Sequence, residues 1–265
     1  MPARRYPVLA AKPTRSAKRI DAPRATGRLD AVAPECRRPR NRFTAIMATR
    51  MRNTRDILAV LFDWDGTLID SWSADANAYL AMFGIFGIPW GMAEFERHYS
   101  PNWHRIYRAA AIPRHRWPEA DAHWLRAYRK YQIHLLPGAR RILETLRGQY
   151  KLGLVTSGHR DRVQPQLRLH KVTSFFAARV FCEDAARRKP DPAALRVVMA
   201  CLRVDAAACV YVGDSPEDIE MAHRAGMRAV AVLGPSPTRR TVAAALPDGL
   251  LWSLAELPAW LREQT

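Results

Sequence analysis

The chain has 265 residues, of which 48% are hydrophobic and 25% are charged, and its formal net charge is +17. This length allows one α/β domain with a small accessory domain, and the apolar content with eight Trp excludes a chain that is disordered throughout. No stretch approaches the roughly 18 consecutive apolar residues of a membrane-spanning helix, so we expect a soluble protein without membrane association.

Most of the positive charge lies at the N-terminus. Residues 1–55 hold 15 of the 42 Lys and Arg but only three acidic residues, which leaves a net charge of +5 for the rest. This Arg-, Pro- and Ala-rich segment lacks sustained periodicity, so we expect a disordered basic tail. Three interpretations of this segment remain open. Translation could start at Met47 or Met51, which would make the preceding residues an artefact; otherwise the segment is an electrostatic tail or a targeting segment. Binding to nucleic acid or an acidic partner is expected, if at all, only through this tail.

The four cysteines, Cys36, Cys182, Cys201 and Cys209, form no CxxC pair and have no His at zinc-finger spacing. They predict ordinary thiols, without disulfides, in a reducing compartment. We therefore expect a cytoplasmic protein.

Short apolar runs alternate with helical segments over most of the remaining chain. The predicted strands are Ile57–Phe62, Leu152–Thr156, Ala178–Phe181, Cys209–Val212 and Ala229–Leu233. Helices are predicted at about 139–148, 160–169, 191–202 and 215–225. This alternation is typical of a three-layer, Rossmann-like α/β core with a parallel sheet, formed here by residues 56–71 and 137–265. In such folds, functional sites lie beyond the carboxyl ends of the strands.

Residues 72–136 interrupt the alternation. They contain no convincing strand, and helices are predicted near 73–86, 92–110 and 118–134, so we expect a small all-helical cap. Arg97, His104, Arg105 or Arg108 of this segment could bind an anionic part of a substrate, although an exposed helix-face charge is the favoured interpretation for each. Its many aromatic residues are interpreted mainly as cap core.

Polar side chains follow the predicted strands in a pattern suited to phosphoryl transfer. They are Asp63, Asp65, Gly66 and Thr67 after the first strand, Thr156, Ser157 and Gly158 after the second, Lys189 before the 191–202 helix, and Asp214 and Asp218 after the Cys209–Val212 strand. A carboxylate can attack phosphorus, and a second one can protonate the leaving oxygen. Mg²⁺ suits Asp63 and Asp214, with Asp218 as a further candidate ligand.

The neighbouring residues have further roles in this phosphoryl-transfer interpretation. Lys189 and Thr156 could stabilise the transferring oxygens, and Gly66 permits a tight turn. Gly66, Thr67, Ser157 and Gly158 are the candidate phosphate or substrate contacts. The structural alternative, in which each Asp only caps a helix, does not explain why Asp63 and Asp65 crowd together after a buried strand.

These motifs, in this order, resemble those of the haloacid dehalogenase-like superfamily, over about residues 57–235. The resemblance implies that Asp63 is the nucleophile, that Asp65 is the acid/base, and that Mg²⁺ is held by Asp63, the Asp65 carbonyl and Asp214, with support from Asp218. The position of the helical cap resembles that of the phosphoglycolate-phosphatase-like branch.

The expected activity is hydrolysis of a small phosphorylated metabolite. Asp65 favours phosphate chemistry over dehalogenation, because a halide leaves without a proton. Pyrophosphate hydrolysis and β-phosphoglucomutase-like transfer remain as alternatives. The sequence predicts neither the substrate nor the oligomeric state.

Overall fold

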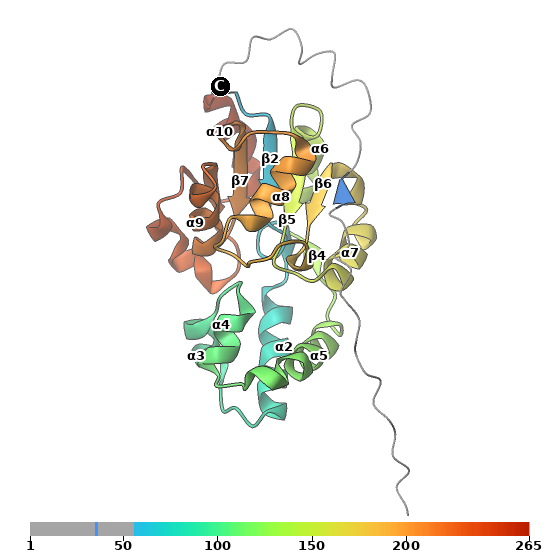
Figure 1. Ribbon diagram of the computed structural model, residues 1–265, viewed down its shortest axis with the longest axis vertical. Coiled ribbons are helices and arrows are strands. Elements are labelled where there is room, and N and C mark those ends of the chain that lie inside the picture. Colours follow the sequence, from blue (N-terminus) through green and yellow to red (C-terminus); the bar gives the residue numbers. More distant parts are fainter. Residues whose placement is uncertain (1–34, 37–55, 265) are drawn as a thin grey trace, which may run out of the picture. The chain divides into compact units, whose positions relative to one another are not determined.

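A seven-stranded sheet lies at the centre of the α/β core in the computed structural model, which describes residues 35–36 and 56–264 (Figure 1). Its strands follow the order β1-β6-β5-β2-β7-β8-β9, and all pairs are parallel except β1 with β6. The strands are β1 (Glu35–Cys36), β2 (Ala59–Phe62), β5 (Lys151–Val155), β6 (Ala178–Val180), β7 (Cys209–Gly213), β8 (Arg228–Val232) and β9 (Gly249–Leu251).

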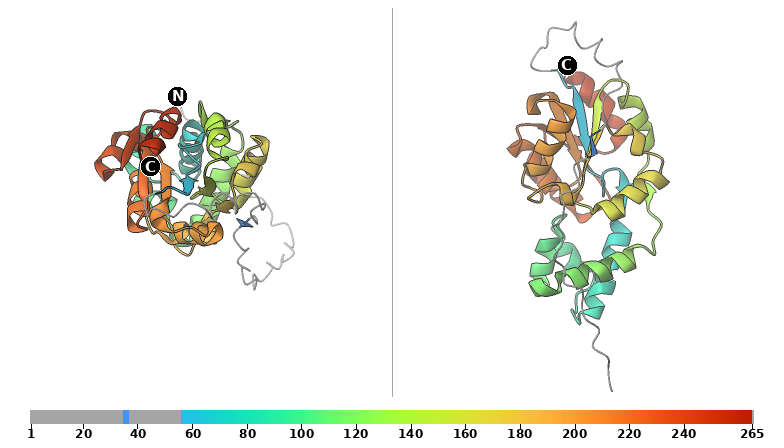
Figure 2. Two further views of the ribbon diagram at one scale, coloured as in Figure 1. Left: turned by 90° about the horizontal axis from the view of Figure 1, so that it is seen from above. Right: turned by 45° about the vertical axis from the view of Figure 1, so that its right-hand side comes forward.

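Helices cover both faces of this sheet, as the two views of Figure 2 illustrate. One face packs against α6 (Ala139–Leu146), α7 (Arg160–Leu169) and α10 (Leu257–Glu263), and the other against α8 (Ala193–Leu202) and α9 (Pro216–Arg224). Because side chains alternate along a strand, Val60 and Phe62 of β2 enter the first core cluster, while Leu61 enters the second. The central strand is therefore buried on both faces, which explains its continuous apolar sequence.

Four helices form an insertion between two very short strands (Figure 1). The helices are α2 (Trp72–Ile85), α3 (Met92–His98), α4 (Trp103–Ala109) and α5 (Trp117–Tyr128), which we call the cap. The strands β3 (Ile69–Asp70) and β4 (His134–Leu135) pair antiparallel at its two ends. The cap has its own core, in which Tyr79, Phe83 and Phe95 are buried.

The predicted fold class is confirmed, since a parallel α/β core carries a helical insertion. Several elements differ in detail. The helix predicted at 92–110 is interrupted between α3 and α4, where Pro101 lies. The short strands β3 and β4, and β9 and α10 near the C-terminus, were not predicted. Connecting segments contain 3-10 turns at Arg114–Arg116, Thr173–Phe175, Cys182–Asp184, Ala206–Ala208, Pro237–Arg240, Val242–Ala245 and Leu254–Glu256.

The cysteines differ from the expectation at one position. Cys182 and Cys209 are free, but Cys201 is disulfide-bonded. The prediction that disulfides are absent is therefore wrong, because whether two cysteines pair depends on tertiary contacts that sequence spacing does not reveal.

Two further predictions concern the tail and the membrane. The tail at residues 1–55 lies outside the described residues, apart from β1. Among the helices of the described part, none is both long and apolar enough to cross a membrane.

Candidate active site

The register of the sheet brings polar residues from three strands to one edge. Phe62 of β2 is aligned with Leu154 of β5 and with Val212 of β7. Asp63, Thr156 and Asp214 each directly follow the last residue of their strand, so they emerge at the carboxyl ends of three neighbouring strands. The amide of Asp63 continues the ladder by donating to the carbonyl of Val212 at 2.9 Å.

A buried lysine joins two of the carboxylates. The Lys189 Nζ atom donates to Asp63 Oδ1 and to Asp218 Oδ1, both at 2.7 Å. Burial opposes the charge on Lys189, but the carboxylates of Asp218 and Asp63 outweigh it and raise the pKa of the lysine. Burial, together with Asp218 and Asp214, raises the pKa of Asp63 well above its ordinary value, although Lys189 acts in the opposite direction.

Asp218 is held by a dense set of donors at the start of α9. Its Oδ2 atom accepts from the Ser215 hydroxyl at 2.7 Å and from the Ser215 amide at 3.2 Å. Its Oδ1 atom accepts from the Tyr211 hydroxyl at 3.2 Å as well as from Lys189. Both oxygens are therefore already satisfied inside the protein.

Asp214 is positioned by hydroxyl groups. Ser236 donates to its Oδ2 atom at 2.8 Å and Thr238 at 3.2 Å, and Thr67 donates to Oδ1 at 3.5 Å. Burial and the charge of Asp218 raise the pKa of Asp214 to about 7. Gly66 turns beside it with φ +75°, and a Cβ at this position would overlap the Asp214 carboxylate.

These carboxylates form a cluster that suits a divalent cation. Asp63, Asp214 and Asp218 are buried, and each offers an oxygen within 4.8 Å of the others. Hard cations such as Mg²⁺ prefer carboxylate oxygens, and crowded buried carboxylates are costly without an opposing charge. The donor set therefore fits the metal implied by the sequence.

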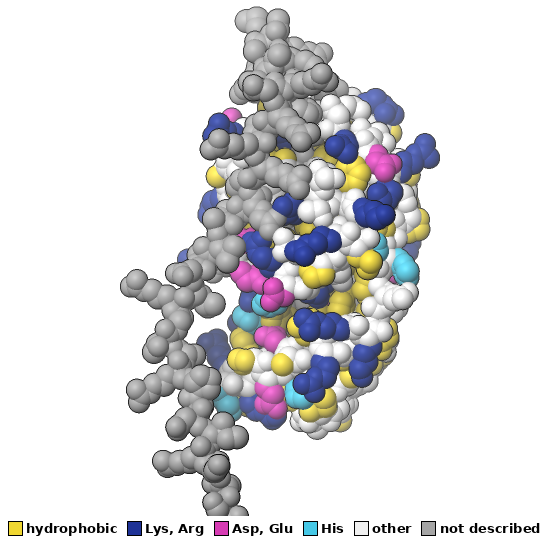
Figure 3. All heavy atoms as spheres, turned by 90° about the vertical axis from the view of Figure 1, so that its right-hand side faces the viewer, with side chains coloured by type: hydrophobic (Ala, Val, Ile, Leu, Met, Phe, Trp, Pro, Cys, Tyr) yellow, Lys and Arg dark blue, Asp and Glu magenta, His cyan; other side chains and the backbone are white. Residues whose placement is uncertain are grey.

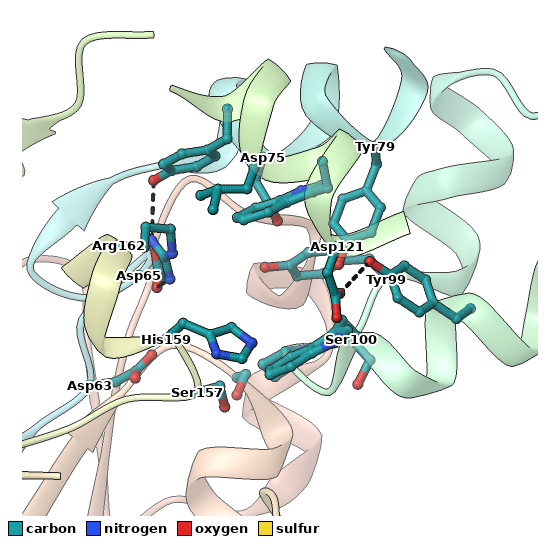
Figure 4. Close-up of a pocket in the computed structure, with 18 of the residues that line it drawn as sticks. Asp63, Asp65, Asp75, Tyr79, Tyr99, Ser100, Asp121, Ser157, His159 and Arg162 are labelled. Carbon is teal, nitrogen blue, oxygen red and sulfur yellow. Dashed lines mark hydrogen bonds and ion pairs between the residues drawn. The ribbon is translucent and has the colours of Figure 1, made fainter. Parts of the chain in front are cut away.

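Asp65 points toward a residue that the sequence reading missed. Arg162 of α7 contacts both of its oxygens, with Nη1 to Oδ1 at 2.9 Å and Nη2 to Oδ2 at 2.5 Å (Figure 4). Burial alone would raise the pKa of Asp65, but the guanidinium outweighs it and lowers this pKa. Tyr128 of the cap accepts a further hydrogen bond from Arg162 at 3.3 Å.

The loop after β5 turns next to these groups. The Thr156 hydroxyl accepts a hydrogen bond from the amide of Gly158 at 2.9 Å, which holds the turn. Ser157, Gly158 and His159 line the adjacent cavity. His159 also approaches Glu183, with Nδ1 and Oε1 3.0 Å apart.

A cavity of about 300 Å³ lies between the catalytic edge and the cap (Figure 4). The core lines it with Asp63, Asp65, Ser157, Gly158, His159, Asp161, Arg162, Asp214, Ser215 and Thr238. The cap side contributes Asp75, Tyr79, Tyr99, Ser100, Pro101, Trp103, Tyr107, Asp121, Ala122, Trp124, Leu125 and Tyr128. Three predicted residues, Lys189, Thr156 and Asp218, are buried and do not line this cavity.

The cap arginines and histidine considered as anion-binding residues do not line this cavity. Arg97 pairs with Glu94 on an exposed surface, and Arg105 pairs with Glu217. Arg188 of the core lies against the cap, with its guanidinium 3.6 Å from the centre of the Trp103 ring. This contact joins the core to the cap.

The structure adds functional candidates that the sequence reading did not single out. Arg162, Asp75 and Asp121 line the cavity, and Ser236 and Thr238 hold Asp214. Asp75 could have been found from the sequence, because it is a polar residue on the packed face of a predicted helix. The other residues on that face of α2 are buried. No comparable signal marks Arg162, which reaches Asp65 across 97 positions of sequence.

Residues 60–232 match the family of haloacid dehalogenase-like hydrolases, and the chain belongs to this family. It is a phosphatase of the phosphoglycolate-phosphatase type, and phosphatases of this family use a divalent metal.

Three relatives illustrate this relationship. The plasmid-encoded phosphoglycolate phosphatase of Cupriavidus necator is 36% identical over 214 residues, which cover 77% of this chain and 92% of the relative. The pyrophosphatase PpaX of Bacillus velezensis is 27% identical, covering 76% and 94%. A hydrolase from Pseudomonas syringae of known crystal structure superposes with a TM-score of 0.69 at 25% identity, covering 78% of this chain and 98% of its own.

Proposed function

We propose that this protein hydrolyses a small phosphomonoester, with Asp63 as the nucleophile and Mg²⁺ as the metal. The observation that carries the proposal is the position of the Asp63 carboxylate, which borders the cavity at the end of β2 while Lys189 holds one of its oxygens at 2.7 Å. Within the described part of the chain, Lys189 is the only hydrogen-bond donor to this carboxylate. The second oxygen is therefore available to attack phosphorus.

The reaction proceeds in two balanced steps. In the first, an Asp63 oxygen forms a bond to phosphorus, the bond from phosphorus to the ester oxygen breaks, and Asp65 gives its proton to the leaving alcohol. In the second, Asp65 removes a proton from water, whose oxygen attacks the acyl phosphate and releases inorganic phosphate and free Asp63. Lys189 and the amides of the Gly66 and Ser157 turns stabilise the phosphoryl oxygens.

Asp63, Asp214 and the carbonyl of Asp65 would hold Mg²⁺, which would offset the repulsion between phosphate and nucleophile. Asp218 supports this site through Lys189, because its own oxygens already accept four hydrogen bonds. Thr67, Ser157 and Gly158 complete the surroundings of the phosphate.

Residues 56–71 and 137–265 form the catalytic core in this proposal, and residues 72–136 form the cap that excludes water and selects the substrate. The name of the Cupriavidus necator relative makes phosphoglycolate one candidate substrate, and that of the Bacillus velezensis relative supports pyrophosphate as the alternative. The cytoplasmic location remains a prediction from the sequence.

The test is phosphate release from a panel of phosphomonoesters and pyrophosphate, with Mg²⁺ and after its removal by a chelator. We expect turnover that requires Mg²⁺ and that falls at least a thousandfold in the Asp63→Asn variant, because an amide is a poor nucleophile. Asp205→Asn is the matched control, since Asp205 is exposed and lies before the amino end of β7, remote from the site.

Both variants should keep the circular dichroism spectrum of the wild-type protein. Full turnover by a folded Asp63→Asn variant, or turnover unaffected by metal removal, would refute the proposed mechanism. Net isomerisation of a sugar phosphate with little phosphate release would instead identify a mutase.

A further inference from the structure

The cap side of the cavity has an unusual chemical composition for an enzyme that would bind an anionic leaving group. Six aromatic side chains line it, which we call the aromatic wall: Tyr79, Tyr99, Trp103, Tyr107, Trp124 and Tyr128. Their rings are close together, since the Trp124 centroid lies 5.9 Å from that of Tyr79 and 4.8 Å from that of Tyr128. Guanidinium groups already lie over three of these rings, with Arg188 3.6 Å from the Trp103 centroid and Arg162 5.8 Å and 5.2 Å from those of Trp124 and Tyr128. The wall is therefore rich in aromatic faces, which attract cations.

The charged groups on this side are both acidic. Asp75 of α2 and Asp121 of α5 project into the cavity between the aromatic rings (Figure 4). Asp121 accepts a hydrogen bond from the Tyr107 hydroxyl at 2.8 Å, and neither carboxylate forms an ion pair within the described part of the chain. Two half-buried carboxylates without a cationic partner are costly unless a ligand supplies the positive charge.

Burial raises the pKa of both carboxylates, while Arg162 opposes this rise for Asp75 and His159 and Arg188 oppose it for Asp121, without forming an ion pair with either in the described part of the chain. Arg162 is the only Lys or Arg among the described residues that line the cavity, and both of its terminal nitrogens contact Asp65. The basic side chains of the cap point elsewhere, as Arg97, Arg105 and Arg116 do in their pairs with Glu94, Glu217 and Glu119. A substrate carboxylate placed here would face Asp75 and Asp121, and the described residues on the cap side of the cavity include no cationic side chain to balance it.

A positively charged nitrogen has the opposite preference. Aromatic faces attract ammonium groups, most strongly where water is excluded, and nearby carboxylates add to this attraction. The phosphate group would remain at the core end of the same cavity, next to Asp63 and Asp214. The two ends of the cavity therefore select opposite charges.

We propose that the substrate is a phosphomonoester whose alcohol carries an ammonium group, bound by the aromatic wall with Asp75 and Asp121. This inference rests on the proposed phosphatase function and specifies its substrate class. It disfavours phosphoglycolate, whose leaving group is anionic.

The test compares esters that differ only in charge. Phosphocholine is matched with 3,3-dimethylbutyl phosphate, which has the same shape without the charge, and phosphoethanolamine is matched with propyl phosphate. We expect at least one ammonium ester to exceed its uncharged partner at least tenfold in kcat/KM, and phosphoglycolate to be the poorest substrate. The proposal is overturned if neither ammonium ester exceeds its partner.

Substitutions of the two cavity carboxylates test whether they cause the preference for ammonium esters. Asp75→Asn and Asp121→Asn should each lower the ratio of kcat/KM between the ammonium ester and its uncharged partner several-fold. Asp205→Asn, which removes the same charge outside the cavity, should leave the ratio unchanged. An equal ratio in all three variants would contradict the assignment of the two carboxylates.

A binding measurement separates the two proposals. Calorimetric titration of the Asp63→Asn variant with the same ester pairs reports charge preference without turnover. If no ester is hydrolysed by the wild-type protein, the phosphatase proposal fails, but a tenfold preference for the ammonium ester in binding would still support the cationic subsite. Equal binding of the two members of each pair would refute it.

Discussion

At the scale of single residues, Asp75 lines the ligand cavity, and its ionisation lowers the stability of the folded protein. Burial, with a contribution from the charge of Asp65, raises the pKa of Asp75 to about 7 from an ordinary value of 3.8. Between these two values the folded protein binds a proton that the unfolded chain releases. The contribution of Asp75 to stability is therefore fully present below about pH 4 and is lost as the pH rises through about 7.

The loss of stability with rising pH leads to a prediction for the ligand-free protein. Asp75→Asn cannot ionise, so its melting temperature should exceed that of the wild-type protein by more at pH 8 than at pH 5, with a difference of a few degrees between the two comparisons. Thermal denaturation followed by circular dichroism at both pH values measures it. The matched Asp205→Asn variant should show no such change, and a pH-independent offset for Asp75→Asn would contradict the assignment.

The residues that could be predicted from sequence are those fixed by the sheet. Asp63 and Asp214 directly follow β2 and β7, and Asp65 comes two residues after Asp63, so strand order alone brings them together. Arg162 and Asp121 could not be found in this way, because their positions in the cavity depend on which face of a helix packs toward the core or toward the cap. Site chemistry was thus more predictable than substrate recognition.

At the scale of elements, the residues that cap the start of helix α9 also position a carboxylate of the site. Ser215 accepts a hydrogen bond from the Asp218 amide at 3.3 Å, and the Asp218 side chain accepts from the Ser215 amide in return. This reciprocal capping box satisfies amides at the start of the helix and holds the carboxylate that contacts Lys189.

We expect Ser215→Ala to lower the free energy of unfolding by about 1–2 kcal/mol, the usual cost of losing an N-cap together with a buried hydrogen bond. Urea denaturation measures this change. Ser253→Ala is the control, because Ser253 caps an exposed 3-10 turn and does not contact the site. Similar losses in both variants would indicate that the link to Asp218 contributes nothing.

Prediction of the elements succeeded where burial produced a long or continuous pattern. β2 and β7 are apolar along their whole length and were found, whereas β3 and β4 have only two residues each and leave no periodic signal. The break between α3 and α4 was missed because apolar residues continue on either side of Pro101.

At the scale of the whole described part, few polar contacts join the cap to the catalytic core. Glu217, at the start of α9, accepts hydrogen bonds from Ser100 at 2.7 Å and from Arg105 at 3.3 Å. Arg188 packs on Trp103 close to Lys189, and Asn102 donates to the Lys189 carbonyl at 3.5 Å.

On the face seen in Figure 3, basic side chains are spread among apolar and uncharged ones without forming a single patch.

Glu217→Gln should loosen this junction, because the amide cannot form the ion pair with Arg105. We expect amide hydrogen exchange in residues 99–108 to become several-fold faster while exchange in α6 is unchanged, as measured by mass spectrometry. Glu220→Gln, on the same helix but paired with Arg224 at the surface, is the matched control. Unchanged exchange in residues 99–108 would show that other contacts hold the cap.

The pairing of β3 with β4 has a consequence for how such enzymes diversify. It fixes the two ends of the inserted helices next to each other, with Ile69 opposite Leu135. Since the chain leaves and re-enters the core at one place, the whole insertion can change in length or composition over evolution without displacing the strand ends that carry the nucleophile. New substrates can then be acquired by grafting or mutating one continuous stretch of chain.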